Sequence, residues 1–273
     1  MSYQFIIAAV DETGAGLHVA AIALDLAQRA HARLGLLTSI PTAAPVPARS
    51  TAARTVLAGI QQSLVRESGA EVEATCCVVR GVPGIEVPRH AEDHGADLIV
   101  VGHTPRTQSV RLLVGDTADS VTRRSRVPCL LIPPGQDIEG PVVVALDGGR
   151  HSAGVLEAAC QLSLTIGQPV RVVTVESGRP DEPALVTPVI PLARSMKLED
   201  EVAEVSGRLG VTASLEVRRG DVVEEILAAC SEHSARVLAI GFHRGGPAGV
   251  MDGGSIGRRL VHGSSGAVLP VPI

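Results

Sequence analysis

Residues 5–16, FIIAAVDETGAG, and residues 142–154, VVVALDGGRHSAG, decide the fold, because they show one pattern twice in a single chain. Each stretch is an apolar run rich in Val and Ile that ends in an aspartate, Asp11 or Asp147, and continues into glycines. The runs lack polar alternation, which is typical of parallel strands buried on both faces. Each stretch is therefore predicted to be a first strand, followed by a glycine-containing turn into a helix.

The repetition extends over the whole chain. Asp147 follows Asp11 by 136 residues. Three glycines of the second half follow their counterparts by 139 residues, in the pairs Gly81 and Gly220, Gly102 and Gly241, and Gly115 and Gly254. A near-constant offset over this length indicates a duplicated domain rather than a short structural repeat. We place the linker near residues 136–139, which predicts domains of residues 1–137 and 138–273.

Within each half, apolar runs alternate with helical patterns. Second helices are expected near residues 51–68 and 192–209. Ser152 is the expected N-cap of a helix whose apolar stripe consists of Val155, Ala159, Leu162 and Ile166. The β-α-β-α order predicts an α/β protein with two doubly wound, five-stranded parallel sheets of the Rossmann type. In such sheets a ligand crevice lies beyond the carboxyl ends of the strands.

Composition and charge restrict the partners. The chain is 45% hydrophobic and 19% charged, with a net charge of -5, and 23 of its 24 basic residues are scattered arginines. This composition is sufficient for two hydrophobic cores of ordinary domain size. The net charge gives no electrostatic reason to expect nucleic acid binding. The N-terminus has no basic leader, and the apolar runs are too short to cross a bilayer. We expect a cytoplasmic protein without nucleic acid or membrane partners.

Sequence motifs of common catalytic sites are absent. The five cysteines include no CxxC pair, so neither a disulfide framework nor a metal site is predicted. The single lysine, Lys197, lies far from any glycine loop, which excludes a P-loop, and no GxSxG motif occurs. His103 and His243 are expected to be solvated loop residues, and the remaining histidines are expected to show no ligand spacing on a helix face. We predict no catalytic residue and no metal ligand.

The loop that follows the fourth strand of the second half has features of an anion site. It runs from Gly241 through Arg244 and Gly245 to Gly254 and Ser255. Glycines let backbone N–H groups approach an anion, and a helix start presents unpaired N–H groups. Ser255 would add a hydroxyl donor and Arg244 a positive charge. A flexible loop with an ordinary serine N-cap explains the same residues equally well.

Taken with the strand, aspartate and VxxG pattern before it, this loop resembles that of the universal stress protein family. The resemblance covers nearly the whole chain, twice. Members that bind ATP carry Gly, two residues, Gly, nine residues, Gly, and Ser or Thr in this loop. Gly241, Gly254 and Ser255 match this spacing. The middle glycine is displaced, because Arg244 stands in its place and Gly245 lies one residue later.

The resemblance implies a ligand and residues that contact it. The ligand would be ATP or another adenine nucleotide, with or without Mg²⁺. Asp147 and Val175 would meet the adenine and ribose, although a turn residue without a ligand is an equal reading of Asp147. Phe242 is the only aromatic residue available in this half for stacking on the base.

The first half departs further from the pattern. Pro105 stands at the middle glycine position and lacks an N–H donor, while Asp116 replaces the serine and would repel a phosphate. We therefore predict one candidate site, in the second half, and one degenerate copy.

The resemblance also implies an assembly and a function. The last strands, within residues 128–133 and 267–273, would pair edge to edge and make the chain an intramolecular pseudo-dimer. Further homodimerisation and the protein partner stay open. The leading function is a nucleotide-binding stress-response module without an established enzymatic activity. The alternatives are a dimerising interaction scaffold that binds no nucleotide and, third, slow ATP hydrolysis or nucleotidyl transfer.

Overall fold

The computed structural model describes residues 2–11, 14–42, 46–68, 73–103, 117–176, 190–243 and 256–273. The strands of the first half are β1 (Phe5–Ala9), β2 (Arg33–Ile40), β3 (Ala74–Arg80), β4 (Leu98–Gly102) and β5 (Cys129–Ile132). Its helices are α1 (Gly14–Ala30), α2 (Val46–Ser68), α3 (Pro83–Asp93) and α4 (Thr117–Arg124).

The second half repeats this order. Its strands are β6 (Val142–Ala145), β7 (Val170–Glu176), β8 (Ala213–Arg219), β9 (Val237–Phe242) and β10 (Ala267–Pro272). Its helices are α5 (Ser152–Ile166), α6 (Ile190–Leu209), α7 (Val222–Glu232) and α8 (Ile256–Gly263).

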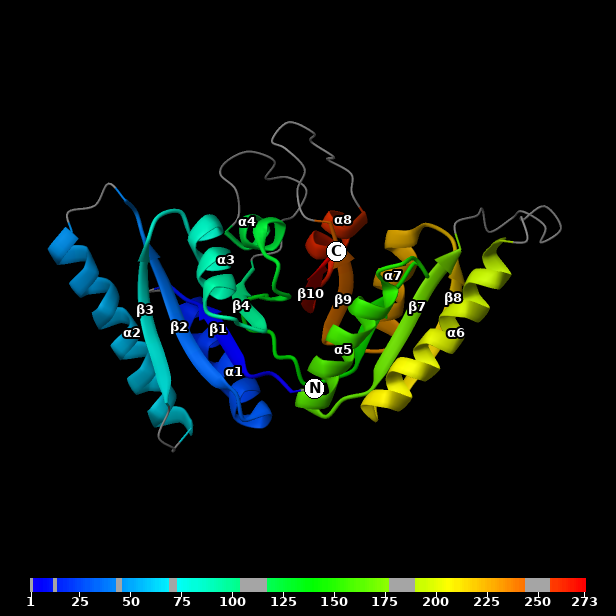
Figure 1. Cartoon of the computed structure of the whole chain (residues 1–273), viewed down its shortest axis with the longest axis horizontal. Coiled ribbons are helices and arrows are strands. Elements are labelled where there is room, and N and C mark those ends of the chain that lie inside the picture. The colour runs from blue at the N-terminus through cyan, green and yellow to red at the C-terminus, as the bar shows by residue number, and fades with distance from the viewer. Residues whose placement is uncertain are drawn as a thin grey trace.

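All ten strands form one sheet in the order β3-β2-β1-β4-β5-β10-β9-β6-β7-β8. Within each half the neighbouring strands pair in parallel, whereas β5 and β10 pair antiparallel. The two halves therefore lie side by side with their last strands at the centre (Figure 1). This arrangement confirms the prediction of two doubly wound five-stranded sheets joined through the last strands.

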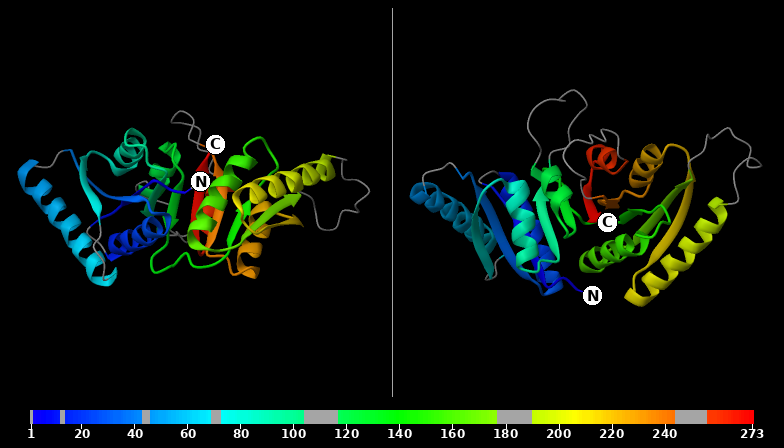
Figure 2. Two further views of the ribbon diagram at one scale, coloured as in Figure 1. Left: turned by 60° about the horizontal axis from the view of Figure 1, so that its bottom comes forward. Right: turned by 45° about the horizontal axis from the view of Figure 1, so that its top comes forward.

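Helices cover both faces of the sheet (Figure 2). One apolar cluster contains residues of α1, α2, α5 and α6, and the other contains residues of α3, α4, α7 and α8. Successive residues of β4 alternate between the two clusters: Leu98 and Val100 face one, and Ile99 and Val101 face the other. Strands buried on both faces have no polar positions to alternate with, which explains their continuous apolar sequence.

The seam between the halves is short because of prolines. Ala267 and Ile273 donate their N–H groups to carbonyls of the β9 side, so alternate residues of β10 face β9. Residues 268, 270 and 272 therefore face β5, and both Pro270 and Pro272 lack an N–H donor. Pairing with β5 is accordingly found at Val268, which lies opposite Leu131.

Side chains around the linker add contacts between the halves. α1 touches α5 across the molecule. His18 Nε2 donates to the Gln136 carbonyl at 2.8 Å. Arg29 pairs with Glu139 and also donates to the carbonyl of Ile166, at the last turn of α5. A cation suits the negative end of a helix dipole, so Arg29 links three segments of the chain.

The predicted stripe of α5 is confirmed, since Val155, Ala159, Leu162 and Ile166 are all buried. The prediction of Ser152 as the N-cap is wrong by one residue. His151 holds that position without a side-chain cap, and Ser152 is the first helical residue. The second helices begin at Val46 and Ile190, a few residues before the expected starts.

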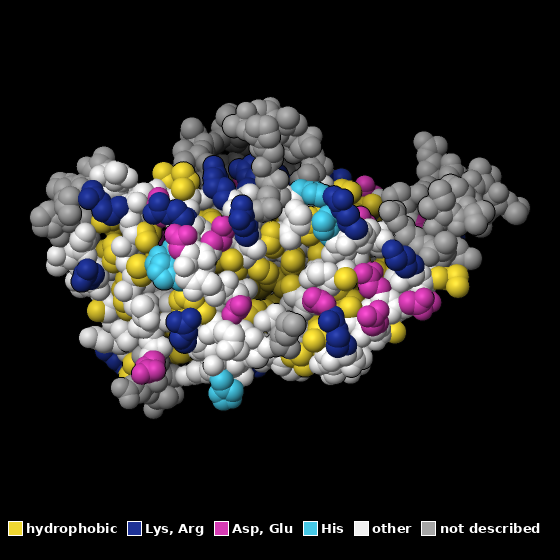
Figure 3. Space-filling view, in the orientation of Figure 1, with side chains coloured by type: hydrophobic (Ala, Val, Ile, Leu, Met, Phe, Trp, Pro, Cys, Tyr) yellow, Lys and Arg dark blue, Asp and Glu magenta, His cyan; other side chains and the backbone are white. Residues whose placement is uncertain are grey.

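The face shown in Figure 3 carries acidic and basic side chains interspersed with apolar ones. Large exposed apolar side chains, such as Val82 and Met196, come from different elements. Across the described ranges, we find no helix with the length and apolarity that a bilayer crossing requires.

The seam generates a stability prediction. Leu131→Ala should lower the free energy of unfolding by about 2–5 kcal/mol, because it leaves a cavity where the two halves meet. Leu164→Ala is the control, because Leu164 is 43% exposed on α5, and it should cost less than about 1 kcal/mol. Chemical denaturation of both variants measures the difference. Equal losses would contradict a central role for the seam.

Candidate functional site

Three strands of the second half end at the same edge of the sheet. Ala145 of β6 lies between Val173 of β7 and Ile240 of β9 in register. Asp147, Val175 and Gly241 each follow one of these residues by one or two positions. The chain leaves β6 toward α5, on one face of the sheet, and leaves β9 toward α8, on the other. This is the switch point at which doubly wound sheets open a ligand crevice.

Asp147 is an exposed residue held by the turn that follows β6. Its Oδ1 accepts the Gly149 N–H at 2.8 Å and the Ser152 hydroxyl at 3.4 Å. A Cβ atom at Gly149 would lie 2.9 Å from Oδ1, so the tight turn favours glycine there. Among the described residues, Oδ2 has no donor. The turn therefore uses Oδ1 of Asp147, and a ligand would use Oδ2 of the same carboxylate.

Val175 presents its peptide group at the same edge of the sheet. Leu146 N–H donates to Val173 O at 3.0 Å, so the peptide groups of Val173 face β6. Gly220 N–H donates to Glu176 O, so those of Glu176 face β8. Because peptide groups alternate along a strand, those of Val175 face the β6 side, where β6 has already ended. Val175 thus offers one N–H donor and one carbonyl acceptor to a ligand.

Gly241 and Phe242 form the tightly packed end of β9. A Cβ atom at Gly241 would lie 3.2 Å from Ile273 and 3.3 Å from Val155, so glycine allows β10 and α5 to close on this strand. Phe242 is only 9% exposed, and its ring lies 3.3 Å from the Cβ position of Gly257. The first turn of α8 therefore rests on this ring. Little of Phe242 is left for stacking, and main-chain and aliphatic groups must hold any base.

The remaining predicted site residues, Arg244, Gly245, Gly254 and Ser255, lie outside the described residues, as do Pro105, Gly115 and Asp116 of the first half. The structure therefore brings together Asp147, Val175 and Gly241 of the predicted set.

The equivalent edge of the first half differs in its packing. Asp11 follows β1 as Asp147 follows β6, and Val10 N–H donates to Leu37 O as Leu146 does to Val173. Gly16 stands where the second half has Ser152, because both follow the aspartate by the same interval. A Cβ atom at Gly16 would lie 2.4 Å from the Asp11 carbonyl, so no side chain fits.

The two histidines that follow the fourth strands behave differently. His243 is exposed, as predicted, but the prediction of a solvated loop residue is wrong for His103, which is 3% exposed. The His103 ring centroid lies 5.7 Å from that of His262, on α8 of the other half. His103 at the carboxyl end of β4 thus lies close to the last turn of α8.

The cysteines offer no reactive thiolate. All five are free. Burial raises the pKa of the Cys129 and Cys230 thiols to about 12 and that of the Cys160 thiol to about 11. Burial also raises the pKa of Cys76 and Cys77, on β3. At neutral pH these thiols stay protonated, which favours their role as small apolar residues.

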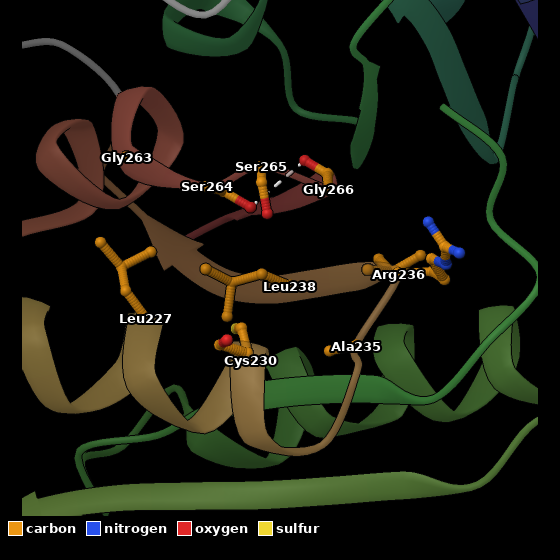
Figure 4. A pocket seen from close by; sticks show the side chains of 11 residues that line it. Leu227, Cys230, Ala235, Arg236, Leu238, Gly263, Ser264, Ser265 and Gly266 are labelled. Carbon is orange, nitrogen blue, oxygen red and sulfur yellow. Dashed lines mark hydrogen bonds between the residues drawn. The ribbon is translucent and has the colours of Figure 1, made fainter. Parts of the chain in front are cut away.

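A small pocket of about 90 Å³ lies at the opposite end of β9, among α7, α8 and the turn before β10 (Figure 4). Cys230, Ser264 and Gly266 line it. Ser264 donates its hydroxyl to Gly266 O at 3.2 Å. The pocket opens beside Val237 and Leu238, the first residues of β9, and so it is separate from the crevice at Gly241.

The fold defines a tandem, doubly wound α/β protein. Its candidate ligand site is the edge of the sheet at the carboxyl ends of β6, β7 and β9. The sequence profile of the universal stress protein family matches residues 2–133 and 140–272. The chain therefore belongs to the universal stress protein family, in a two-domain form. The predicted division at residues 137 and 138 stays a prediction.

Individual members of the family match this chain over a short segment or at low sequence identity. A universal stress protein of Methanocaldococcus jannaschii is 33% identical over 55 residues, 20% of this chain and 34% of the relative. A second from that organism is 38% identical over 55 residues, which are 32% of its length. The matches thus span about a third of these curated relatives. A universal stress protein structure from Archaeoglobus fulgidus covers 98% of both chains at 18% identity with a TM-score of 0.76, which establishes the shared fold.

The turn after β1 generates a prediction with a matched control. Gly16→Ala should cost about 1–3 kcal/mol of folding stability, because the methyl group collides with the Asp11 backbone. Gly154→Ala changes the third residue of α5, as Gly16 is the third of α1, and nothing lies within 4 Å of its Cβ position. The control should be neutral or stabilising by up to about 1 kcal/mol. Thermal or urea unfolding of both variants distinguishes them, and a neutral Gly16→Ala would refute the packing account.

Proposed function

We propose that this universal stress protein binds an adenine nucleotide in the crevice of its second half and acts as a regulatory module of the stress response. The observation that supports this most is the convergence of Asp147, Val175 and Gly241 at one switch point of the sheet. Ligand binding would change the conformation or partners of the protein, and no catalytic group is invoked.

The chemistry of the described groups fits an adenosine. The adenine edge carries an exocyclic amino donor beside a ring nitrogen acceptor, which matches the carbonyl and N–H of Val175. A ribose hydroxyl can donate to Asp147 Oδ2, because the turn uses Oδ1. The buried ring of Phe242 supplies little stacking, so main-chain contacts would provide most of the discrimination between bases.

Sequence features indicate which residues would bind the phosphates of the nucleotide. Gly241, Gly254 and Ser255 keep the spacing of ATP-binding family members, and a helix start favours an anion. Arg244 and the displaced Gly245 would contribute a positive charge and an N–H group. ATP, ADP and AMP all share the adenosine part, so the described edge does not choose among them. Mg²⁺ would accompany a di- or triphosphate through its phosphate oxygens.

Isosteric changes at the two aspartates test the site. Asp147→Asn keeps an oxygen for the Gly149 N–H but removes the charge that strengthens a ribose hydrogen bond. It should weaken nucleotide binding about tenfold or more. Asp11→Asn, the matched change in the first half, should leave affinity unchanged. Calorimetric titration of untagged protein with ATP, ADP and AMP, with and without Mg²⁺, measures both and should give one site per chain.

The same titration decides between the leading function and its alternative. If the protein shows neither binding nor a thermal shift with millimolar ATP, ADP or AMP, the result favours the interaction scaffold. A specific ligand must stabilise the native state. Because the chain has one Tyr and no Trp, the adenine of a co-purified nucleotide would also dominate its ultraviolet spectrum at about 260 nm.

Reciprocal exchange at the helix starts tests the asymmetry of the halves. Ser255→Asp should weaken nucleotide binding, because a carboxylate there repels the phosphate and competes for the helix N–H groups. Asp116→Ser should create no second site, because Pro105 still withholds a donor. The number of sites and the affinity by calorimetry report both effects. Two sites in the unaltered chain would overturn the prediction.

A further inference from the structure

The sheet ends at two outer strands, β3 in the first half and β8 in the second. Figure 1 shows them at opposite ends of the molecule, β3 beside α2 and β8 beside α6. Among the described residues, no strand lies beyond either one, so each has an outer edge of peptide groups that the sheet does not use. Such an edge can pair with a further strand unless charges, prolines or bulges prevent it.

The register of β3 identifies the peptide groups that face outward. Gly81 N–H donates to Ile40 O at 2.9 Å, so the peptide groups of Gly81 face β2. Because peptide groups alternate along a strand, those of Cys77 also face β2. Those of Cys76 and Val78 face the outer edge, together with the other even-numbered residues between 74 and 80.

The two outer strands differ in charge. Residues 74–79 of β3 include no charged side chain. At the offset of 139 residues, Cys77 of β3 corresponds to Glu216 of β8. Val79 corresponds in the same way to Arg218, which pairs with Glu216 at 2.7 Å. Charged side chains on an outer strand oppose its pairing with another strand. The edge of the second half thus has a protection that the edge of the first half lacks.

We propose that the outer edge of β3 is an interaction surface for a second copy of this chain, whose β3 pairs with it antiparallel about a two-fold axis. A full overlap of Ala74–Arg80 with its copy places Cys77 on the axis, because it is the middle residue of seven. Cys76 of each copy then lies opposite Val78 of the other. Both have outward-facing peptide groups, so the hydrogen-bonding positions of the two strands coincide.

The charges at the ends of β3 favour this occupant. Arg80 of each copy lies opposite Ala74 of the other, so the two arginines are about 20 Å apart along the strands. Glu73, next to Ala74, brings an opposite charge near each Arg80. The same register on β8 would place Glu216 opposite its own copy, and like charges directly opposite one another destabilise a strand pair. Self-pairing therefore suits β3 and not β8.

Helix α2 extends the surface beside β3. Cys76 Sγ lies 3.7 Å from Gln61 Oε1 on this helix. Val65 follows Gln61 by one turn, so it lies on the same side of α2, and it is 40% exposed. About the proposed axis, α2 of both copies lies on one face of the joined sheet. Within the chain, α1 and α5 have this relation across the pairing of β5 with β10.

The test is the mass of the untagged, reduced, full-length protein by analytical ultracentrifugation over a wide range of concentration. The unaltered chain should form a dimer. Cys76→Lys should weaken dimerisation about tenfold or more, because the symmetry brings two like charges close together on the paired edges. Val217→Lys adds the same charge at an exposed position of β8 and should dimerise as the unaltered chain does. A monomeric unaltered chain, or equal losses in both variants, would overturn the proposal.

Crosslinking checks the register. Residues that face each other in a non-hydrogen-bonded antiparallel pair have Cα atoms about 4.5 Å apart, within the range of a disulfide. Diamide, which is reduced as two thiols become one disulfide, should therefore join two copies through Cys77. Crosslinked dimers should form in the unaltered chain and in Cys76→Ser, but not in Cys77→Ser. A crosslink that survives Cys77→Ser would refute the pairing about Cys77.

A second variant guards against a folding defect. Cys76 is exposed, so Cys76→Lys should keep the far-ultraviolet circular dichroism spectrum of the unaltered chain. Thr75→Lys, at the neighbouring exposed position, should keep the spectrum and also weaken dimerisation. Lysine variants of β3 that are folded and still dimerise as the unaltered chain does would show that the contact lies elsewhere and refute the surface.

Discussion

The antiparallel pairing of β5 with β10 is the contact on which the rest of the structure depends. Leu131 and Val268 meet there, and the sheet continues through them from one half to the other. Each apolar cluster can therefore extend across both halves on its own face of the sheet. Pro270 and Pro272 keep the pairing short, because they withhold donors on the β5 side. A short strand pairing thus joins the two domains through one continuous sheet.

The corresponding edges of the two halves differ in their packing. The turn after β6 admits Ser152 beside Asp147, whereas the turn after β1 admits only Gly16. In the first half, His103 is buried, and its ring centroid lies 5.7 Å from that of His262 in the other half. The two halves therefore differ both in local packing and in loop sequence.

Much of the fold could be predicted from the sequence, because buried parallel strands are uninterrupted apolar runs and the order of elements restricts their topology. The proximity of His103 to His262 could not, since the two residues lie in different halves. The start of α5 differs by one residue from the prediction, because the hydroxyl of Ser152 bonds to Asp147 instead of capping the helix.

The pairing of β5 with β10 within one chain makes the association of the two halves independent of protein concentration. Because both strands belong to one polypeptide, their encounter is intramolecular, and its effective concentration is set by the chain that connects β5 to β6 rather than by the amount of protein. A pair of separate subunits joined by so short a contact would come apart at low abundance. This chain would keep its two halves assembled from its first folded copy in a cell.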